Sequence, residues 1–237
     1  MGAQPSRIAD CAEVLPGYSL RGCAKHEPSG SHQVIVGRHL SLPGPSTLVL
    51  STMDLATMDL ATMDLATLGP AAPDPPVSGL SIPGMGYRYR PEHELRITPK
   101  GKVEKYSVKS GDVLLISRGV KNHAILVESV PERTIASATF YLLRVRHGVD
   151  PAYLAWSLNQ APIQDGIRQA RTGAGTPIVQ RKLFTDIMIP LPSYEDQCKI
   201  AKIGGCMVKE RILRQALMEH TIALHHSIGQ QLIRDLA

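Results

Sequence analysis

The sequence of 237 residues predicts an α+β fold, in which a domain of short strands and helices is followed by one long helical arm. Short apolar runs bounded by glycine and proline predict the strands, and an apolar stripe with helical spacing predicts the arm. A chain of this length has room for one domain of ordinary size and one such arm. We therefore assign residues 1–192 to the domain and residues 193–237 to the arm.

Turn residues separate the predicted strands of the domain. Gly111 and Asp112 form one turn, and the run that follows at residues 113–116 is apolar throughout, which predicts a central strand. The run at residues 187–189 is expected to end at the double-proline stop of Pro190 and Pro192, because proline cannot donate to a ladder. In chain order, the predicted strands cover residues 87–97, 103–108, 113–116, 124–127, 140–145 and 187–189.

Two helices of the domain are predicted after the last central strands. Asp150 is a suitable N-cap and Pro151 a suitable first helical residue, so one helix begins there. Residues 163–170 predict a second helix, which leads into a loop at Gly173.

The arm begins with a capping pattern. Ser193 stands three residues before Asp196, which is close to a helix-start box. As a single helix the arm is about 65 Å long. Gly204 and Gly205 together cost about 2 kcal/mol relative to alanine in a helix, which predicts a kink or break there. The apolar stripe fits either a coiled-coil seam or a helix lying on its own domain. Its members are Ile200, Ile203, Met207, Leu213, Leu217, Leu224, Ile228 and Leu232.

Residues 51–86 are predicted to be a low-complexity insertion. The pentapeptide TMDLA occurs three times in succession, and a period of five builds no single apolar face. Repeat architectures use units of about 20 residues or more. A flank rich in proline and glycine follows, so we expect a loop here.

The composition is that of a globular protein, with 43% hydrophobic and 20% charged residues. Aromatic residues make up only 4%, which argues against binding single strands with rows of stacked rings. No apolar run approaches the roughly 20 residues that span a bilayer, and the N-terminus lacks a signal-peptide pattern. We therefore expect a cytoplasmic protein without membrane contact.

Neither the cysteines nor the histidines predict a metal site, and we expect no cofactor. The cysteines contain no C-x-x-C pair and fit reduced structural thiols. His220, His225 and His226 are spaced five and one apart, so they do not share a helix face as metal ligands would. The cysteines are Cys11, Cys23, Cys198 and Cys206.

Catalytic motifs are also missing from the sequence. The segment GAGTP at residues 173–177 is superficially like a phosphate loop, but no Lys-Ser or Lys-Thr follows it. No D-P-P-Y or N-P-P-Y segment of a methyltransferase occurs, and no spaced Asp, Glu and Lys group predicts a magnesium-dependent nuclease. We therefore expect a protein that is not an enzyme.

Positive charge is concentrated in the middle of the chain. Residues 1–87 contain 4 Lys and Arg against 7 Asp and Glu, a net charge of −3. Residues 193–237 contain 6 against 5, a net charge of +1, whereas residues 88–192 contain 16 against 9, a net charge of +7. A surface that faces phosphates explains this excess, and so does a basic surface without a ligand.

Several segments, taken in chain order, carry a family resemblance. Residues 172–203 read TGAGTPIVQRKLFTDIMIPLPSYEDQCKIAKI, in which G-x-G-T precedes I-x-I-P-L-P, an acidic residue with glutamine, and an Ile-rich helix. This order resembles the specificity subunits of type I restriction-modification enzymes. Four upstream segments fit the same family in the same order: RIADCAEVLPGYSL at 7–20, KSGDVLLISRG at 109–119, ATFYLLRVR at 138–146 and PAYLAWSL at 151–158.

The resemblance implies a mixed β-sheet target-recognition domain that reads DNA, followed by an arm for dimerisation and methyltransferase docking. The implied partners are double-stranded DNA, the methyltransferase subunit, a second copy of the chain and, indirectly, the restriction subunit. Members of the family usually carry two recognition domains. This half-length chain is therefore either a working half that pairs with a second copy, or a truncated remnant that acts only as a protein-interaction module.

The resemblance also implies where DNA is contacted. Lys and Arg in loops are expected on phosphates, and side chains with paired hydrogen-bonding groups on base edges. Each candidate taken singly fits a solvated surface charge equally well. The candidate DNA-binding residues are Arg88, Arg90, Arg118, Lys121, Asn122, Arg171, Arg181 and Lys182.

Overall fold

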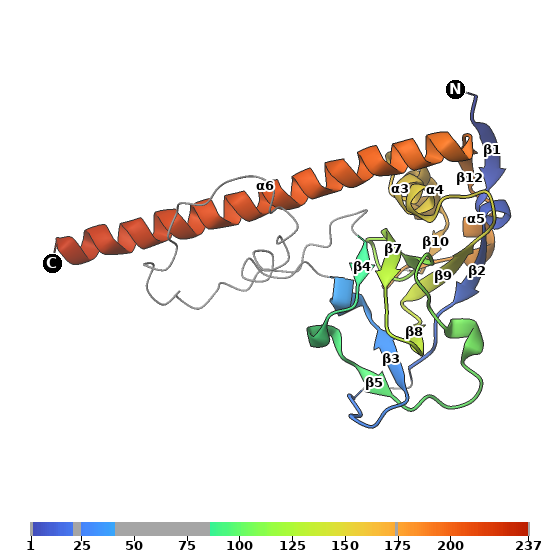
Figure 1. The fold of residues 1–237 in the computed structure, drawn as a ribbon, viewed down its shortest axis with the longest axis horizontal. Helices are drawn as coiled ribbons and strands as arrows, with labels where there is room; N and C mark the ends of the chain where they lie inside the picture. Colours follow the sequence, from blue (N-terminus) through green and yellow to red (C-terminus); the bar gives the residue numbers. More distant parts are fainter. Residues whose placement is uncertain (1, 21–24, 41–85, 174, 237) are drawn as a thin grey trace. The chain divides into compact units, whose positions relative to one another are not determined.

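The predicted α+β fold is confirmed by a computed structural model of the chain (Figure 1). Its residues fall into two compact units, and along the C-terminal helix the boundary lies between Val208 and Lys209. The predicted insertion at residues 51–86 lies outside the described residues, apart from Gly86. The structure describes residues 2–20, 25–40, 86–173 and 175–236.

The middle layer of the first unit is a five-stranded sheet. In spatial order its strands are β2 (Ala12–Pro16), β9 (Phe140–Val145), β6 (Val113–Ile116), β7 (Ala124–Ser129) and β4 (Tyr87–Arg88). The first four strands pair antiparallel, while β4 pairs parallel with β7, so the sheet is mixed. β6 lies at its centre with Val113, Leu114 and Leu115 fully buried, which confirms the predicted central strand.

Layers cover both faces of this sheet, because side chains of a strand point to the two faces in turn. Val113 and Leu115 belong to a buried cluster with residues of the helices, whereas Leu114 belongs to a cluster with residues of a smaller sheet. The helices are α1 (Ile8–Cys11), α3 (Pro151–Leu158), α4 (Ala161–Gln169) and α5 (Arg181–Thr185). The smaller sheet consists, in spatial order, of β5 (Arg96–Ile97), β3 (His32–Ile35) and β8 (Thr134–Ala136).

Two of the predicted strands are wrong in part or entirely. Residues 87–97 form strands only at their two ends, β4 and β5, and residues 103–108 contain a 3-10 helix where a strand was expected. Val103 and Tyr106 pack against the same buried cluster, because positions three apart lie on one side of a 3-10 turn. The described 3-10 helices are η1 (Gly37–Leu40), η4 (Pro91–His93) and η5 (Glu104–Tyr106).

The arm is one uninterrupted helix, α6 (Tyr194–Asp235), so the predicted kink at Gly204 and Gly205 is wrong. A Cβ atom on Gly204 would lie 2.1 Å from Cδ1 of the Trp156 ring. The missing side chain therefore lets α6 pass directly over Trp156 of α3. Glycine is needed at position 204 because the helix packs closely against Trp156, and not because the helix bends there.

The predicted helix caps are confirmed. Asp150 Oδ1 accepts a hydrogen bond from the Tyr153 N–H at 2.7 Å, and Ser193 Oγ accepts one from the Asp196 N–H at 3.2 Å. The buried Gln197 joins the two helix starts, because its Oε1 accepts a hydrogen bond from the Asp150 N–H at 2.8 Å. The beginning of α6 is thus fixed to the beginning of α3.

β1 (Gln4–Arg7) and β12 (Met188–Leu191) form a two-stranded ribbon, in which the strand ends directly before Pro192, as expected, but not at Pro190. β12 runs through this proline, and Pro5 stands opposite it. Two prolines can face each other at a non-hydrogen-bonded position of an antiparallel ladder, because neither residue has to donate an N–H to the other strand there. The Tyr153 hydroxyl donates to the Pro190 carbonyl and holds the ribbon against α3.

The described cysteines are free thiols: Cys11 is buried, Cys198 half-buried and Cys206 exposed, while Cys23 lies outside the described residues. Burial, reinforced by the charge of Asp10, raises the pKa of Cys11 to about 11, so its thiol stays protonated. Among the residues that the structure describes, no group of three or more His, Cys, Asp or Glu is placed to hold a metal ion. None of the described helices has the length and apolar character to cross a membrane.

Candidate nucleic-acid interface

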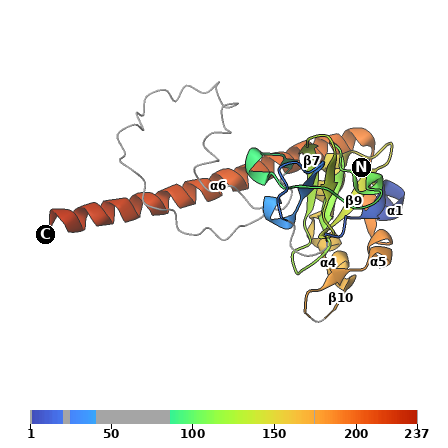
Figure 2. The same cartoon turned by 90° about the horizontal axis from the view of Figure 1, so that it is seen from below.

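Two segments that carry predicted DNA-binding residues meet in the fold. One is the loop between β6 and β7, residues 117–123, and the other is residues 168–182, which contain the hairpin of β10 (Arg171–Thr172) and β11 (Ile178–Val179). Figure 2 shows the hairpin next to α4 and α5, at one end of the first unit. We call the surface formed by these two segments the hairpin end.

Backbone hydrogen bonds fix the two segments to each other. The Gly119 N–H donates to the Pro177 carbonyl at 2.8 Å, and the Val179 N–H donates to the Ser117 carbonyl at 2.9 Å. Gly119 has a φ of +89°, a conformation that residues with a Cβ atom rarely adopt. Glycine therefore allows the loop to turn toward the hairpin and to pair with it.

Asn122 is the buried support of the loop, with 1% of its surface exposed. Its Nδ2 donates to the Ile116 carbonyl at 2.8 Å, and its Oδ1 accepts from Arg171 Nε at 2.6 Å. Its backbone carbonyl accepts from Gln164 Nε2 of α4 at 2.9 Å. Both ends of the amide group are thus engaged inside the protein, so the geometry favours a supporting role over the predicted contact with a base.

Arg171 closes the same network from the hairpin. Its Nε binds Asn122, and one terminal nitrogen donates to the Val120 carbonyl at 2.6 Å. Burial, followed by the nearby charge of Arg168, lowers the pKa of the Arg171 guanidinium, which nevertheless remains protonated. Arg171 therefore holds the loop with two of its donors, and its charge adds to the basic surface.

The other candidates at the hairpin end face solvent. The two segments contain six Lys and Arg and no Asp or Glu, and Arg168 among them forms an ion pair with Asp165 of α4 at 2.8 Å. Opposite charges that would cancel the field are therefore absent from these two segments. The predicted candidates with exposed cationic side chains are Arg118, Lys121, Arg181 and Lys182.

Tyr141 of β9 lies beneath this surface. Its hydroxyl donates to the Val179 carbonyl at 2.6 Å. Burial raises the pKa of Tyr141, while the charges of Arg181 and Arg118 act in the opposite direction. Both arginines are therefore close enough to the same phenol to act on it, although they come from different segments.

Arg88 and Arg90 do not join the hairpin end. β7 begins beside the loop at Ala124 and ends at Ser129, and it is Ser129 that stands opposite Arg88. A strand of this length separates its two ends by about 17 Å. Arg88 Nε also lies 2.9 Å from Glu128 Oε2, so its charge is paired on the protein.

Sequence reasoning missed Val120 and Gln164. Val120 is 69% exposed at the outer part of the loop, and its position between two cationic residues, Arg118 and Lys121, was a signal visible in the sequence. Gln164 stabilises the loop from α4, and no local pattern distinguished it from a solvated helix residue.

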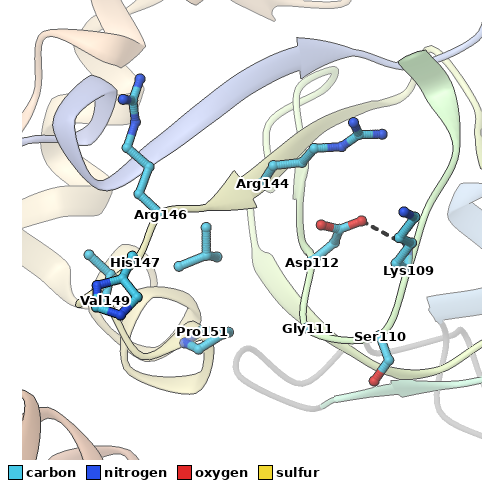
Figure 3. A pocket seen from close by; sticks show the side chains of 10 residues that line it. Lys109, Ser110, Gly111, Asp112, Arg144, Arg146, His147, Val149 and Pro151 are labelled. Atoms are coloured by element: carbon cyan, nitrogen blue, oxygen red, sulfur yellow. Dashed lines mark hydrogen bonds between the residues drawn. The ribbon is translucent and has the colours of Figure 1, made fainter. Parts of the chain in front are cut away.

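A pocket of about 350 Å³ lies elsewhere in the first unit (Figure 3). Asp112 accepts a hydrogen bond from the Lys109 N–H at 2.8 Å, and burial raises the pKa of its carboxyl group. Arg144 donates to the Ser107 carbonyl at 3.0 Å, and Figure 3 shows Arg146 pointing away from Asp112. Asp112 and Arg144 of this pocket thus hold the backbone before β6.

In the second unit, α6 carries a row of exposed aliphatic side chains. Leu213, Leu217 and Leu224 are each more than half exposed. At 3.6 residues per turn, these three fall within an arc of about 40°. We call this row the α6 stripe, and its members are Leu213, Leu217, Leu224, Ile228 and Leu232.

Comparison with known proteins finds similarity to type I restriction-modification proteins. No family model matches the chain. Over 98 residues, 40% of its length, the chain is 34% identical to the type I restriction enzyme MjaVIII specificity subunit of Methanocaldococcus jannaschii, of which the match covers 22%. A solved structure described as the basis of complex assembly and conformational transition of the type I R-M system shares the fold, with a TM-score of 0.57 and 12% identity over 99% of this chain and 45% of that one.

Two further solved structures align less closely. The S subunit of a type I restriction-modification system from M. genitalium gives a TM-score of 0.46 at 11% identity, over 86% of this chain and 38% of its own. The HsdS subunit of Thermoanaerobacter tengcongensis gives a TM-score of 0.47 at 14% identity, over 94% of this chain and 40% of its own. The chain thus spans less than half the length of the relatives it matches. The chain is thus similar in sequence to a type I specificity subunit over 98 residues and shares its fold with a solved structure of the type I R-M system, which supports the resemblance to specificity subunits of type I restriction-modification enzymes.

Proposed function

We propose that the chain is a sequence-specific DNA-recognition subunit that binds duplex DNA through the hairpin end. One observation carries the proposal: six Lys and Arg and no Asp or Glu lie on two segments that hydrogen bonds fix to each other. Concentrated positive charge neutralises DNA phosphates, and a fixed backbone keeps the side chains in register with the groove. The name of the M. jannaschii relative, a specificity subunit, supports the same function.

In this proposal, catalysis belongs to partner subunits. The methyltransferase subunit docks on the arm, and the restriction subunit acts through the resulting complex. The α6 stripe supports this assignment, because burying a row of exposed aliphatic side chains against another helix stabilises the association of the two helices.

A chain with one recognition domain reads half of a split target. Two copies related by a two-fold axis and joined through α6 would read a palindromic site of two identical half-sites with a fixed spacer. The α6 stripe also favours the second candidate function, a subunit that docks on the methyltransferase without reading DNA.

The test is binding of the full chain to duplex DNA, with and without the methyltransferase subunit. Duplexes are selected from a random pool, and affinity is measured by fluorescence anisotropy between about 50 and 200 mM salt. We expect affinity to fall by orders of magnitude over this range, because several phosphates are neutralised. Binding to the methyltransferase alone, with no binding to any duplex, would establish the second function instead.

A further inference from the structure

Val120 is an apolar side chain at the outer part of a basic surface. It is 69% exposed, and the cations Arg118 and Lys121 stand on either side of it. A single exposed valine is ordinary and needs no explanation by itself. What distinguishes Val120 is how its backbone is held and what surrounds it.

The backbone on both sides of Val120 is fixed. Its own carbonyl accepts a hydrogen bond from Arg171 at 2.6 Å, and the N–H of the preceding Gly119 is bound by the Pro177 carbonyl at 2.8 Å. Two residues later, Asn122 is buried and tied to β6, α4 and the hairpin. The loop therefore presents Val120 outward in one conformation and loses little further entropy when it binds a partner.

The surroundings of Val120 match the chemistry of a DNA groove. The neighbouring Arg118 pairs with Ile178 of the hairpin in an isolated β-bridge, which places a second exposed aliphatic residue on the same surface. Cations around an aliphatic patch fit a partner with phosphates at its rims and an apolar group between them. The major groove of DNA has this arrangement, because thymine exposes its C5-methyl group there between the two backbones.

We propose that Val120 is a specificity-determining residue that packs against a thymine C5-methyl group in the major groove. This inference rests on the proposed DNA-binding function. The valine methyl groups can neither donate nor accept hydrogen bonds. The contact therefore raises the affinity for thymine and does not raise the affinity for cytosine, which lacks the methyl group. Asn122 and Arg171 are positioning residues, since they hold the backbone that carries Val120.

The test uses the full chain and a duplex selected from a random pool. Deoxyuridine replaces thymine throughout the duplex, which removes only the C5-methyl groups and keeps the pairing. We expect the wild-type affinity to fall about fourfold, the factor that corresponds to one lost methyl contact. Val120→Ala should bind the thymine duplex more weakly by a similar factor and should respond little to uracil. Met188→Ala, at another exposed apolar residue, is the matched control and should keep the full uracil response.

The outcomes separate the two proposals. If the wild type binds no duplex, with or without the methyltransferase, the DNA-binding function itself fails. If the wild type binds but ignores uracil, or if Val120→Ala responds to uracil as strongly as the wild type, the DNA-binding function stands and the role of Val120 is overturned. Circular dichroism of Val120→Ala confirms that the variant is folded, as expected for a change at an exposed side chain.

Discussion

The hairpin end and the α6 stripe are both exposed, yet they are built in opposite ways. At the hairpin end, side chains and backbone groups hold two loops together, and the outward side chains are mostly cationic. On α6, the helix backbone satisfies its own hydrogen bonds, and the outward side chains of the stripe are aliphatic. The first surface suits a charged, hydrated partner, while the second gains stability when a partner removes it from water. We therefore expect mutations to separate the two functions.

The largest effect is expected on α6. Replacing Leu213, Leu217 and Leu224 together with Asp places three charges in the proposed seam, where their desolvation opposes association. Self-association and methyltransferase docking should each weaken by at least about 100-fold, as measured by light scattering and co-purification. Ala223, His226 and Gln230 on the opposite side of the helix, changed together to Asp, form the control and should leave both associations intact. Persistence of both in the first variant would show that α6 is not the assembly surface.

The next effect is expected at the hairpin end. Changing Arg118, Lys121, Arg181 and Lys182 together to Ala should weaken duplex binding by about 100-fold at low salt and flatten its salt dependence, because fewer phosphates are neutralised. Assembly through α6 should be unchanged in the same variant. Anisotropy titrations at several salt concentrations measure both quantities.

Arg88→Ala combined with Arg90→Ala is the control for charge alone. These residues were candidates on sequence grounds, but Arg88 is paired with Glu128 and lies at the far end of β7. We expect less than a threefold change in affinity, about 0.6 kcal/mol. An equal loss in both variants would mean that overall charge, and not the hairpin end, accounts for binding.

A smaller effect is expected from the support beneath the loop. Asn122→Ala leaves the Ile116 carbonyl and part of the Arg171 guanidinium without their partner, which costs about 2 kcal/mol of unfolding free energy. DNA affinity should fall as well, because the loop loses its fixed conformation. Asn122→Asp keeps the acceptor for Arg171 and should recover part of that affinity. A loss of affinity without any loss of stability in chemical denaturation would instead identify Asn122 as a base contact.

The smallest effect compares two adjacent glycines in α6. A methyl group at Gly204 meets the Trp156 ring, whereas nothing lies within 4 Å of the position it would take at Gly205. We expect Gly204→Ala to lower the unfolding free energy by about 1–2 kcal/mol through overpacking, and Gly205→Ala to raise it by up to about 1 kcal/mol through helix propensity. Urea denaturation measures both, and equal effects would show that α6 does not pass close to Trp156.

Much of the fold followed from local chemistry. The central strand at Val113, the caps at Asp150 and Ser193, and the long helical arm were predicted because each depends on neighbours within a few residues. The conformation of residues 103–108 was not predicted correctly, because a 3-10 turn and a strand can both bury apolar residues. Packing against the smaller sheet favours the turn here. The role of Gly204 likewise depends on a residue distant in the sequence, Trp156, against which it packs.

For the site, the sequence by itself determined the inventory of charges, the loops that carry them and the family resemblance. It could not determine which candidates share a surface, because that depends on pairing between distant segments. The bridge between Arg118 and Ile178 joins the loop to the hairpin and so brings Arg171 to Asn122. The pairing of β4 with β7 leaves Arg88 at the other end of a strand. Only the tertiary structure separated Asn122, buried with its amide engaged, from Lys121 beside it, which faces solvent. The physical reason is that burial and hydrogen bonding depend on contacts between segments far apart in the chain, whereas charge and propensity belong to each residue wherever it lies.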